Sequence, residues 1–142
     1  MTSTLPKEPL AGGCQCGAAR YAITEDPVRL YVCHCRECQK QSASAFGISL
    51  IVPRSGLERT KGATSSWTRP TDSGGRLRCV FCPECGTRLW HESDPPGATL
   101  SVKGGSLDQP LDLGGGPHLW TGRKLGGVVL PEGTPRHDRE PD

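Results

Sequence analysis

The segment VCHCREC at residues 32–38 places three of the chain's eight cysteines within six positions. The other five cysteines lie in two further segments, GGCQCG at residues 12–17 and CVFCPECG at residues 79–86. Cysteines concentrated in this way are typical of metal sites, because two or three thiolates from one tight turn can bind the same ion. The sequence therefore predicts a fold organised around metal-binding turns.

The composition indicates one domain whose core needs additional stabilisation. The chain has 142 residues, its hydrophobic fraction is only 34%, and it contains 19 glycines and 13 prolines. The first 13 residues contain no apolar run that resembles a secretory signal, and no segment has the roughly 18 apolar residues of a membrane span. We therefore expect a cytoplasmic protein, in which reduced cysteines bind metal rather than form the alternative disulfides.

The charge distribution argues against nucleic acid as a partner. Seventeen basic and fifteen acidic residues give a net charge of +2, and the two signs are interspersed. No run of like charges forms a basic stripe, and aromatic residues make up only 5% of the chain. The sequence predicts neither a nucleic-acid nor a membrane partner, and it does not indicate an oligomeric state.

Short strands dominate the predicted secondary structure. Alternation of apolar with other residues predicts strands at 19–24, 28–32, 46–52 and 76–81, with weaker patterns at 64–68, 87–91 and 99–103. Residues 36–44 suit a single helical turn, and turn residues separate the strands. The prediction is a mostly β fold of short antiparallel sheets.

Two cysteine pairs suit a closed structural metal site. Cys14 and Cys16 lie near the start of the domain, whereas Cys82 and Cys85 lie in a Pro–Glu turn that begins 66 positions after Cys16. Zinc prefers four ligands in a tetrahedron, and thiolates bind it strongly. Because such a link restricts the unfolded chain, we expect this metal to be required for folding. Gly86 suits the left-handed turn after the last ligand.

Three clustered cysteines, Cys33, Cys35 and Cys38, remain for a second site. Three thiolates leave one position of a zinc ion open, which is the arrangement of a catalytic site rather than a structural one. A thiol bound at that position would lose its proton and become a nucleophile at neutral pH. These residues are therefore candidates for both metal binding and catalysis.

The eighth cysteine, Cys79, leaves an alternative open. Cys79 could be a fourth ligand that closes the second site. Strand alternation places it with Leu77 and Phe81, opposite to Cys82, which favours a buried core thiol. A β-bulge near the turn could reverse that assignment.

The histidines lack a ligand pattern of their own. His34 lies between two cysteines, but adjacent side chains of an extended chain point apart, so we expect it behind the ligands or exposed. His91 and His118 have no partner motif and are expected to be structural or surface residues.

The cysteine segments, together with two later ones, resemble the family of glutathione-dependent formaldehyde-activating enzymes and centromere protein V-like proteins. The matching segments are GGCQCG at 12–17, CHCREC at 33–38, FCPECG at 81–86, GGSLD at 104–108, HLW at 118–120 and VVLP at 128–131. Cys79 lies outside the family's seven-cysteine pattern, and Gly126-Gly127 stands where a bulkier pair is expected. The likeness covers residues 11–135.

The resemblance implies an Mss4-like, zinc-stapled β domain with two zinc ions as cofactors. A structural zinc would be held by Cys14, Cys16, Cys82 and Cys85, and a catalytic zinc by Cys33, Cys35 and Cys38. We expect this domain at 11–135, between a flexible leader at 1–10 and a disordered tail at 136–142.

The resemblance also implies a reaction, in which glutathione adds to formaldehyde to give S-(hydroxymethyl)glutathione. Written in reverse, this is a carbon–sulfur lyase reaction with a small-molecule thiol and an aldehyde as partners. Arg20, Arg36 and Lys40 are candidates to meet the carboxylates of glutathione. The alternative is a non-catalytic zinc-stapled binding module or a glutathione carrier. A water or thiol as the fourth zinc ligand favours an enzyme or carrier, whereas Cys79 in that position favours a structural module.

Overall fold

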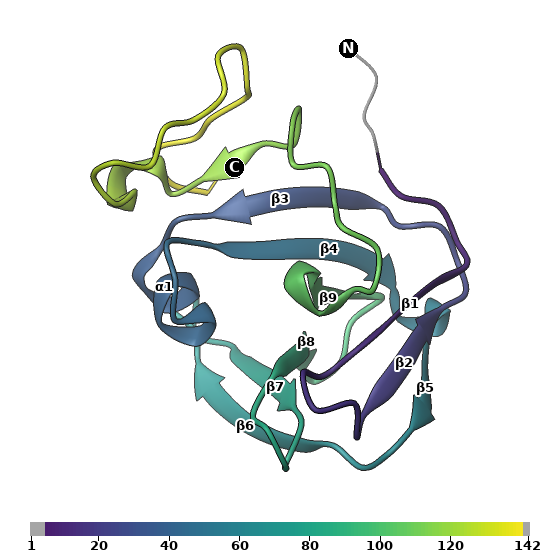
Figure 1. Ribbon diagram of the computed structural model, residues 1–142. Helices are drawn as coiled ribbons and strands as arrows, with labels where there is room; N and C mark the ends of the chain where they lie inside the picture. The colour runs from purple at the N-terminus through teal and green to yellow at the C-terminus, as the bar shows by residue number, and fades with distance from the viewer. Residues whose placement is uncertain (1–4, 141–142) are drawn as a thin grey trace.

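The computed structural model describes residues 5–140, so the ends of the predicted leader and tail, 1–4 and 141–142, lie outside the described residues. The chain is mostly β, as predicted (Figure 1). Its strands are β1 (Leu10–Gly13), β2 (Arg20–Ile23), β3 (Arg29–Cys33), β4 (Gly47–Pro53), β5 (Leu57–Lys61), β6 (Ser65–Pro70), β7 (Arg76–Phe81), β8 (Arg88–Asp94), β9 (Thr99–Lys103) and β10 (His118–Leu119). The helical elements are α1 (Arg36–Ser42) and the 3-10 helices η1 (Arg54–Gly56), η2 (Gly104–Ser106) and η3 (Thr121–Arg123).

The strands form two sheets. The smaller sheet has the order β1-β2-β5, and the larger has the order β10-β3-β4-β9-β8-β7-β6. Neighbouring strands pair antiparallel except at one edge, where the short strand β10 runs parallel to β3. The helix α1 connects β3 to β4 and lies at one end of the larger sheet (Figure 1).

The apolar core lies between the two sheets. Tyr21 and Ile23 of β2 belong to the same buried cluster as Trp90 of β8 and Val102 of β9. The rings of Tyr21 and Trp90 meet edge to face with their centroids 6.1 Å apart. The Tyr21 hydroxyl lies 2.7 Å from the hydroxyl of Ser106, which satisfies the polar end of this buried side chain.

The opposite face of the larger sheet carries a row of polar side chains, because successive residues of a strand point to opposite faces. We call this set the polar row; across neighbouring strands it comprises Tyr31, Ser49, Lys103, Ser101, His91 and Cys79. The Nζ atom of Lys103 donates hydrogen bonds to the hydroxyls of Ser49 and Ser101, at 3.2 and 3.3 Å. On β3 the row continues from Tyr31 to Cys33, two residues along the same strand.

The C-terminal segment folds back over β3 and α1. The backbone N–H of His118 donates to the carbonyl of Pro135, and that of His137 donates to the carbonyl of His118, both at 2.9 Å. This segment lies along the outer edge of the larger sheet in Figure 1, beyond β3. Residues 118–137 therefore cover the strand that ends in the second cysteine segment.

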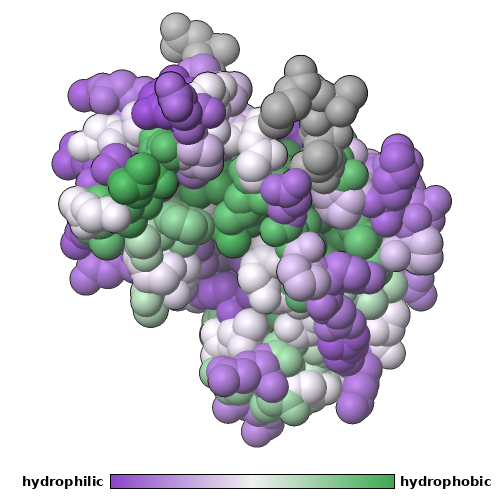
Figure 2. Space-filling model, turned by 45° about the horizontal axis from the view of Figure 1, so that its top comes forward, coloured by the Kyte–Doolittle hydropathy of each residue, from purple (hydrophilic) through white to green (hydrophobic). Residues whose placement is uncertain are grey.

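The molecular surface is mixed in character. Figure 2 shows hydrophilic residues around the margins of one face and hydrophobic residues gathered toward its upper middle. Among the described residues, the exposed large hydrophobic side chains are Val28, Trp67, Leu125 and Val129. No helix within residues 5–140 is long and apolar enough to cross a membrane.

Candidate metal centres and the pocket between them

The first cysteine cluster joins two hairpin turns, one from each sheet. Cys14 and Cys16 lie in the turn between β1 and β2, and Cys82 and Cys85 lie in the turn between β7 and β8. Their four sulfur atoms all lie within 4.8 Å of one another. The structure thus brings together the four cysteines from which the sequence predicts a structural site.

Hydrogen-bond donors surround the sulfurs of the first cluster. The backbone N–H of Ala19 donates to the sulfur of Cys14 at 3.2 Å. The Thr87 hydroxyl lies 3.2 Å from the sulfur of Cys85 and lowers the pKa of that thiol to about 5. Gly86 has a φ of +81°, as the sequence predicts. Donors of this kind stabilise the thiolate, which is the form of cysteine that binds metal.

The second cluster is built from one continuous segment. Cys33 is the last residue of β3, Cys35 is the N-cap of α1, and Cys38 lies in the first turn of that helix. The sulfur of Cys35 accepts a hydrogen bond of 3.3 Å from the backbone N–H of Cys38, so one atom both caps the helix and faces the other thiols. The three sulfurs lie within 4.8 Å of one another, and no other ligand atom of the described residues 5–140 joins this group.

The thiols of the second cluster perturb one another. Hydrogen bonds from Cys33 and Cys38 lower the pKa of Cys35, whereas the hydrogen bond with Cys35 raises the pKa of Cys33. Three thiolates this close together repel one another unless a cation lies among them. A zinc ion is such a cation, and it is soft enough to prefer sulfur ligands. Both clusters therefore have a donor set that fits zinc.

Buried hydrogen bonds hold the second cluster from behind. His34 is fully buried, and its Nε2 atom lies 2.8 Å from Nδ1 of His118 on β10. The side-chain amide of Gln39 donates to the carbonyls of His34 and Arg123, at 2.8 and 2.9 Å. Both histidines are thus buried rather than exposed. The sequence did not single out Gln39, since a polar residue in a short helix gives no signal of burial.

Cys79 stands apart from both clusters. It is fully buried, on the face of the larger sheet opposite the main core, between His91 and Trp67 of the neighbouring strands. The register of β7 and β8 shifts between Val80 and Phe81, but this irregularity does not bring Cys79 to the second cluster. The predicted buried thiol is confirmed, and within the described chain Cys79 does not join the second cluster.

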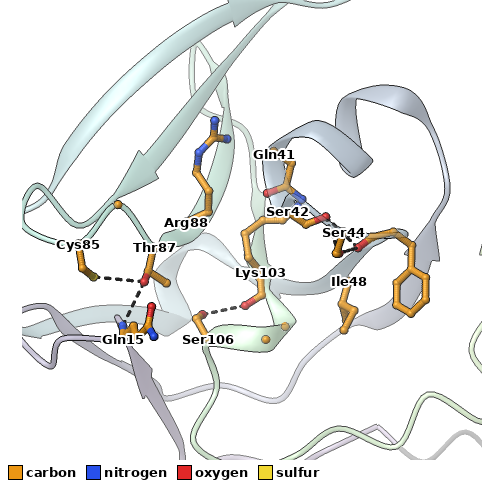
Figure 3. Close-up of a pocket in the computed structure, with 14 residues that line it drawn as sticks. Gln15, Gln41, Ser42, Ser44, Ile48, Cys85, Thr87, Arg88, Lys103 and Ser106 are labelled. Carbon is orange, nitrogen blue, oxygen red and sulfur yellow. Dashed lines mark hydrogen bonds between the residues drawn. The ribbon is translucent and has the colours of Figure 1, made fainter.

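A pocket of about 460 Å³ lies between the turns of the first cluster and the C-terminal end of α1, the helix that carries Cys38. Its walls are formed by the turns of the first cluster (Gln15 and residues 85–88), the end of α1 with the following loop (Gln41, Ser42, Ser44 and Phe46), and β4, β9 and η2 (Ile48 and residues 103–106), as Figure 3 shows. A Cβ atom added to Gly47 would lie 2.9 Å from Nε2 of Gln41 and 3.4 Å from the sulfur of Cys38. Gly47 therefore keeps open the space between the pocket wall and the second cluster.

The cationic residues that line the pocket differ from Arg20, Arg36 and Lys40, the three candidates that the sequence indicated for binding carboxylates. Arg20 is paired with Asp108, with 2.9 Å between Nη1 and Oδ1, and Arg36 donates to the side-chain oxygen of Gln39. Lys40 is exposed, and none of these three candidate cations lines the pocket. Lys103 and Arg88 occupy its walls instead.

Two clusters of cysteine thiols, each of which could hold a metal ion, lie in a mostly β fold. The family model of the glutathione-dependent formaldehyde-activating enzyme matches residues 9–123, and the chain belongs to this family. It is similar to a Penicillium rubens protein provisionally named a glutathione-dependent formaldehyde-activating enzyme, with 31% identity over 93 residues. The match covers 61% of this chain and 48% of that protein, so the chain spans about half the length of this curated relative.

A solved structure supports the fold independently. The crystal structure of a Rhodobacter sphaeroides protein, determined as a structural genomics target, is similar with a TM-score of 0.58. The similarity covers 76% of this chain and 98% of that one at 22% sequence identity. Because the sequence identity is only 22%, this similarity is evidence for the fold and for nothing further.

Proposed function

We propose that the protein is a zinc-dependent enzyme of the carbon–sulfur lyase type, which forms and cleaves the adduct of a thiol and an aldehyde. The adduct that membership of the family suggests is S-(hydroxymethyl)glutathione, made from glutathione and formaldehyde. The observation that carries the proposal is the second cluster, in which three thiols have no fourth ligand from the described chain. The neighbouring pocket, from which Gly47 leaves space toward the Cys38 sulfur, offers room for a thiol substrate.

The two clusters would have different roles in this enzyme. A structural zinc would be held by Cys14, Cys16, Cys82 and Cys85, and a second zinc by Cys33, Cys35 and Cys38. Zinc at the second cluster would supply acidity, so that a thiol bound there loses its proton at neutral pH. A reducing compartment such as the cytoplasm would keep all seven cysteines in the form that binds metal.

The residues of the chain would orient the reactants. The pocket walls would hold the body of the thiol, while the hydrogen bonds of Gln39 and His34 keep the segment with the second cluster in place. The sulfur would form a bond to the aldehyde carbon, and the carbonyl oxygen would take up the proton that the thiol loses. The reverse reaction breaks the same bond, and no oxidation state changes overall, so no redox cofactor is required.

Two measurements test the proposal. The first is the metal content of the protein, and the second is a titration of the cobalt-substituted protein with a thiol. We expect two metal ions per chain and a change in the cobalt absorption spectrum when glutathione is added. NMR exchange spectroscopy should then show that the protein accelerates the exchange between formaldehyde and S-(hydroxymethyl)glutathione. Two metals without a spectral change would refute an open thiol site and favour a binding module. Thiol binding without faster exchange would indicate a glutathione carrier.

A further inference from the structure

Two cationic residues line the pocket, and no carboxylate lines it. Lys103 is the last residue of β9, and Arg88 is the first residue of β8 (Figure 3). Within residues 5–140, neither cation forms an ion pair with an aspartate or a glutamate. Cations that are partly removed from water and lack an anionic partner lose hydration without compensation. The pocket therefore has an electrostatic preference for an anionic ligand.

Lys103 connects the pocket to the second cluster. Its ammonium group has three N–H donors, and it donates to two neutral hydroxyls, those of Ser49 and Ser101. Burial lowers the pKa of Lys103, while the thiols of Cys38 and Cys33 act in the opposite direction. The pairing of Lys103 with Ser49, and of Ser49 with Tyr31, places Lys103 two strands away from β3, which ends in Cys33. One donor remains for a ligand whose sulfur lies at that cluster.

Arg88 is a second cation, and its orientation is fixed by its neighbours. Its Nη1 atom lies 3.0 Å from Nε2 of His91, and its guanidinium carbon lies 5.9 Å from the centre of the Trp67 ring. A guanidinium group has five N–H donors, so most of them stay available after this contact. Arg88 therefore adds positive potential at the wall of the pocket that lies next to the first cluster.

The size and the remaining walls of the pocket indicate what kind of thiol it would take. At about 460 Å³ the pocket falls in the range of small-molecule sites, and it is far larger than a one-carbon aldehyde requires. Side-chain amides of Gln15 and Gln41 and the hydroxyls of Ser42 and Ser44 also line it, and such groups pair well with peptide groups. An acidic, peptide-like thiol matches both the charge and the polarity.

We propose that Lys103, assisted by Arg88, binds a carboxylate of the thiol substrate, so that the pocket selects acidic peptide thiols such as glutathione over neutral ones. This inference rests on the proposed function, because it requires the sulfur of the same molecule to lie at the second cluster. It assigns to Lys103 a role in substrate specificity that the cysteine pattern does not indicate.

Thiol affinities of the cobalt-substituted protein test this inference. The probes are glutathione and its diethyl ester, which differ in the charge of the two carboxyl groups and share the same thiol. We expect the wild-type protein to bind glutathione about tenfold more tightly than the diester, since a charge-assisted hydrogen bond has roughly that effect. Lys103→Gln should reduce the difference to less than about twofold, and Lys103→Arg, which keeps the charge, should restore much of it.

Two controls separate the carboxylate contact from other effects. Lys40→Gln removes an exposed charge of α1 that does not line the pocket, and it should leave the tenfold preference intact. S-methylglutathione has both carboxylates but no free thiol, and its binding, measured by calorimetry, should weaken in Lys103→Gln and not in Lys40→Gln. Arg88→Gln should show a smaller loss than Lys103→Gln.

The possible outcomes distinguish this inference from the proposed function. If neither glutathione nor the diester changes the cobalt spectrum of the wild-type protein, the proposed open thiol site fails. If both bind equally well, the thiol site stands and the carboxylate contact is refuted. If Lys103→Gln loses cobalt and weakens both thiols to the same extent, Lys103 only balances the charge of the thiolates, and the inference is overturned.

Discussion

The two cysteine clusters differ in how far apart their members lie along the chain. The first joins the β1–β2 turn to the β7–β8 turn, so that Cys16 and Cys82, 66 positions apart, have sulfurs 3.8 Å from each other. The second lies entirely within residues 33–38. A link between distant positions greatly restricts the unfolded chain, whereas a link within six residues hardly does so. Metal at the first cluster should therefore stabilise the fold, and metal at the second should contribute little to global stability.

The clusters also differ in completeness. Four cysteines suffice to close a tetrahedral zinc site, and the first cluster has four. The second has three, and it adjoins Gly47, which leaves room beside Cys38. The comparison indicates that this fold would separate a metal that supports the structure from a metal that is available to a ligand, with the pocket lined by the turns of the first cluster and by the end of α1.

The largest expected effect is that of Cys82→Ala. This variant removes one of four ligands from the cluster that joins the two sheets, and it leaves the others unable to close a tetrahedral site. Zinc binding to structural sites contributes on the order of 10 kcal/mol, comparable to the whole stability of a domain. We expect no cooperative thermal unfolding transition and loss of the native circular dichroism spectrum.

Cys79→Ala is the matched control for Cys82→Ala. It removes an equally buried thiol, but one that belongs to neither cluster. We expect it to retain two metals per chain and to lose only about 1 kcal/mol, since one buried sulfur atom is removed from packing. A Cys82→Ala protein that folds cooperatively would contradict the structural role of the first cluster.

The second cluster should respond in the opposite way. Cys35→Ala removes its central thiol and the N-cap of α1, which together should lower stability by about 1 kcal/mol. The chain should still unfold cooperatively, with one metal per chain instead of two. Thiol binding should be lost, and formaldehyde exchange should fall to the uncatalysed rate.

Metal analysis and thermal unfolding on the same Cys35→Ala sample check this contrast. Retention of two metals and of formaldehyde exchange would show that the second cluster is not the reactive centre. Global unfolding of the variant would instead remove the distinction between the two clusters.

The sequence predicted well which cysteines share a turn, because that information is local. Spacings such as those of Cys33, Cys35 and Cys38 fix which thiols share a turn, independently of the rest of the fold. Alternation likewise predicted β2 and β3, in which alternate residues are buried, and also β4 and β7. Besides the two-residue strand β10, the strands that it missed are β1, which contains two glycines, and β5, where only Leu57 is not exposed. In β1 and β5 the polarity of the side chains gives no indication of the backbone hydrogen bonds that make these segments strands.

The pocket could not be predicted, because it depends on the register between strands that are distant in sequence. Lys103 meets Ser49 through the pairing of β9 with β4, and Arg88 meets Trp67 across β7. The cations chosen from the sequence lay near the cysteines along the chain. Arg20, however, is paired with Asp108, a residue 88 positions away that sequence proximity cannot reveal.

A smaller effect is expected from Gln39→Ala, which tests whether the second cluster depends on the C-terminal segment. The variant removes three hydrogen bonds: the two that the amide donates to the carbonyls of His34 and Arg123, and the one that its oxygen accepts from Arg36. We expect a loss of about 2 kcal/mol in the free energy of unfolding and roughly tenfold weaker metal binding at the second cluster.

The neighbouring exposed residue offers the control for Gln39→Ala. Lys40→Ala changes the next residue of α1 and should alter stability by less than about 0.5 kcal/mol. Competition with a chelator, followed for each metal separately, measures the affinities. Equal weakening at both clusters would indicate a general loss of structure rather than the local support that the hydrogen bonds of Gln39 provide.

The smallest effect concerns His91, which lies in the polar row next to Cys79. Burial, with the nearby charges of Lys103 and Arg88, lowers the pKa of His91 to about 2. In the unfolded chain this histidine takes up a proton below pH 6.5, whereas in the folded chain it stays neutral. The stability that neutral His91 provides is thus complete above pH 6.5 and is lost progressively as the pH falls toward 2.

The variant His91→Gln removes this titration and keeps an oxygen that can accept a hydrogen bond from Arg88. Between pH 7.5 and 5.5, the free energy of unfolding of the wild-type protein should fall by about 1 kcal/mol more than that of the variant. Release of metal at low pH affects both proteins and cancels in the difference. Ser101→Ala changes the same row without a titratable group, so its pH dependence should run parallel to that of the wild-type protein. Parallel curves for His91→Gln as well would mean that His91 takes up its proton in the folded state, and that the polar row near the pocket admits water.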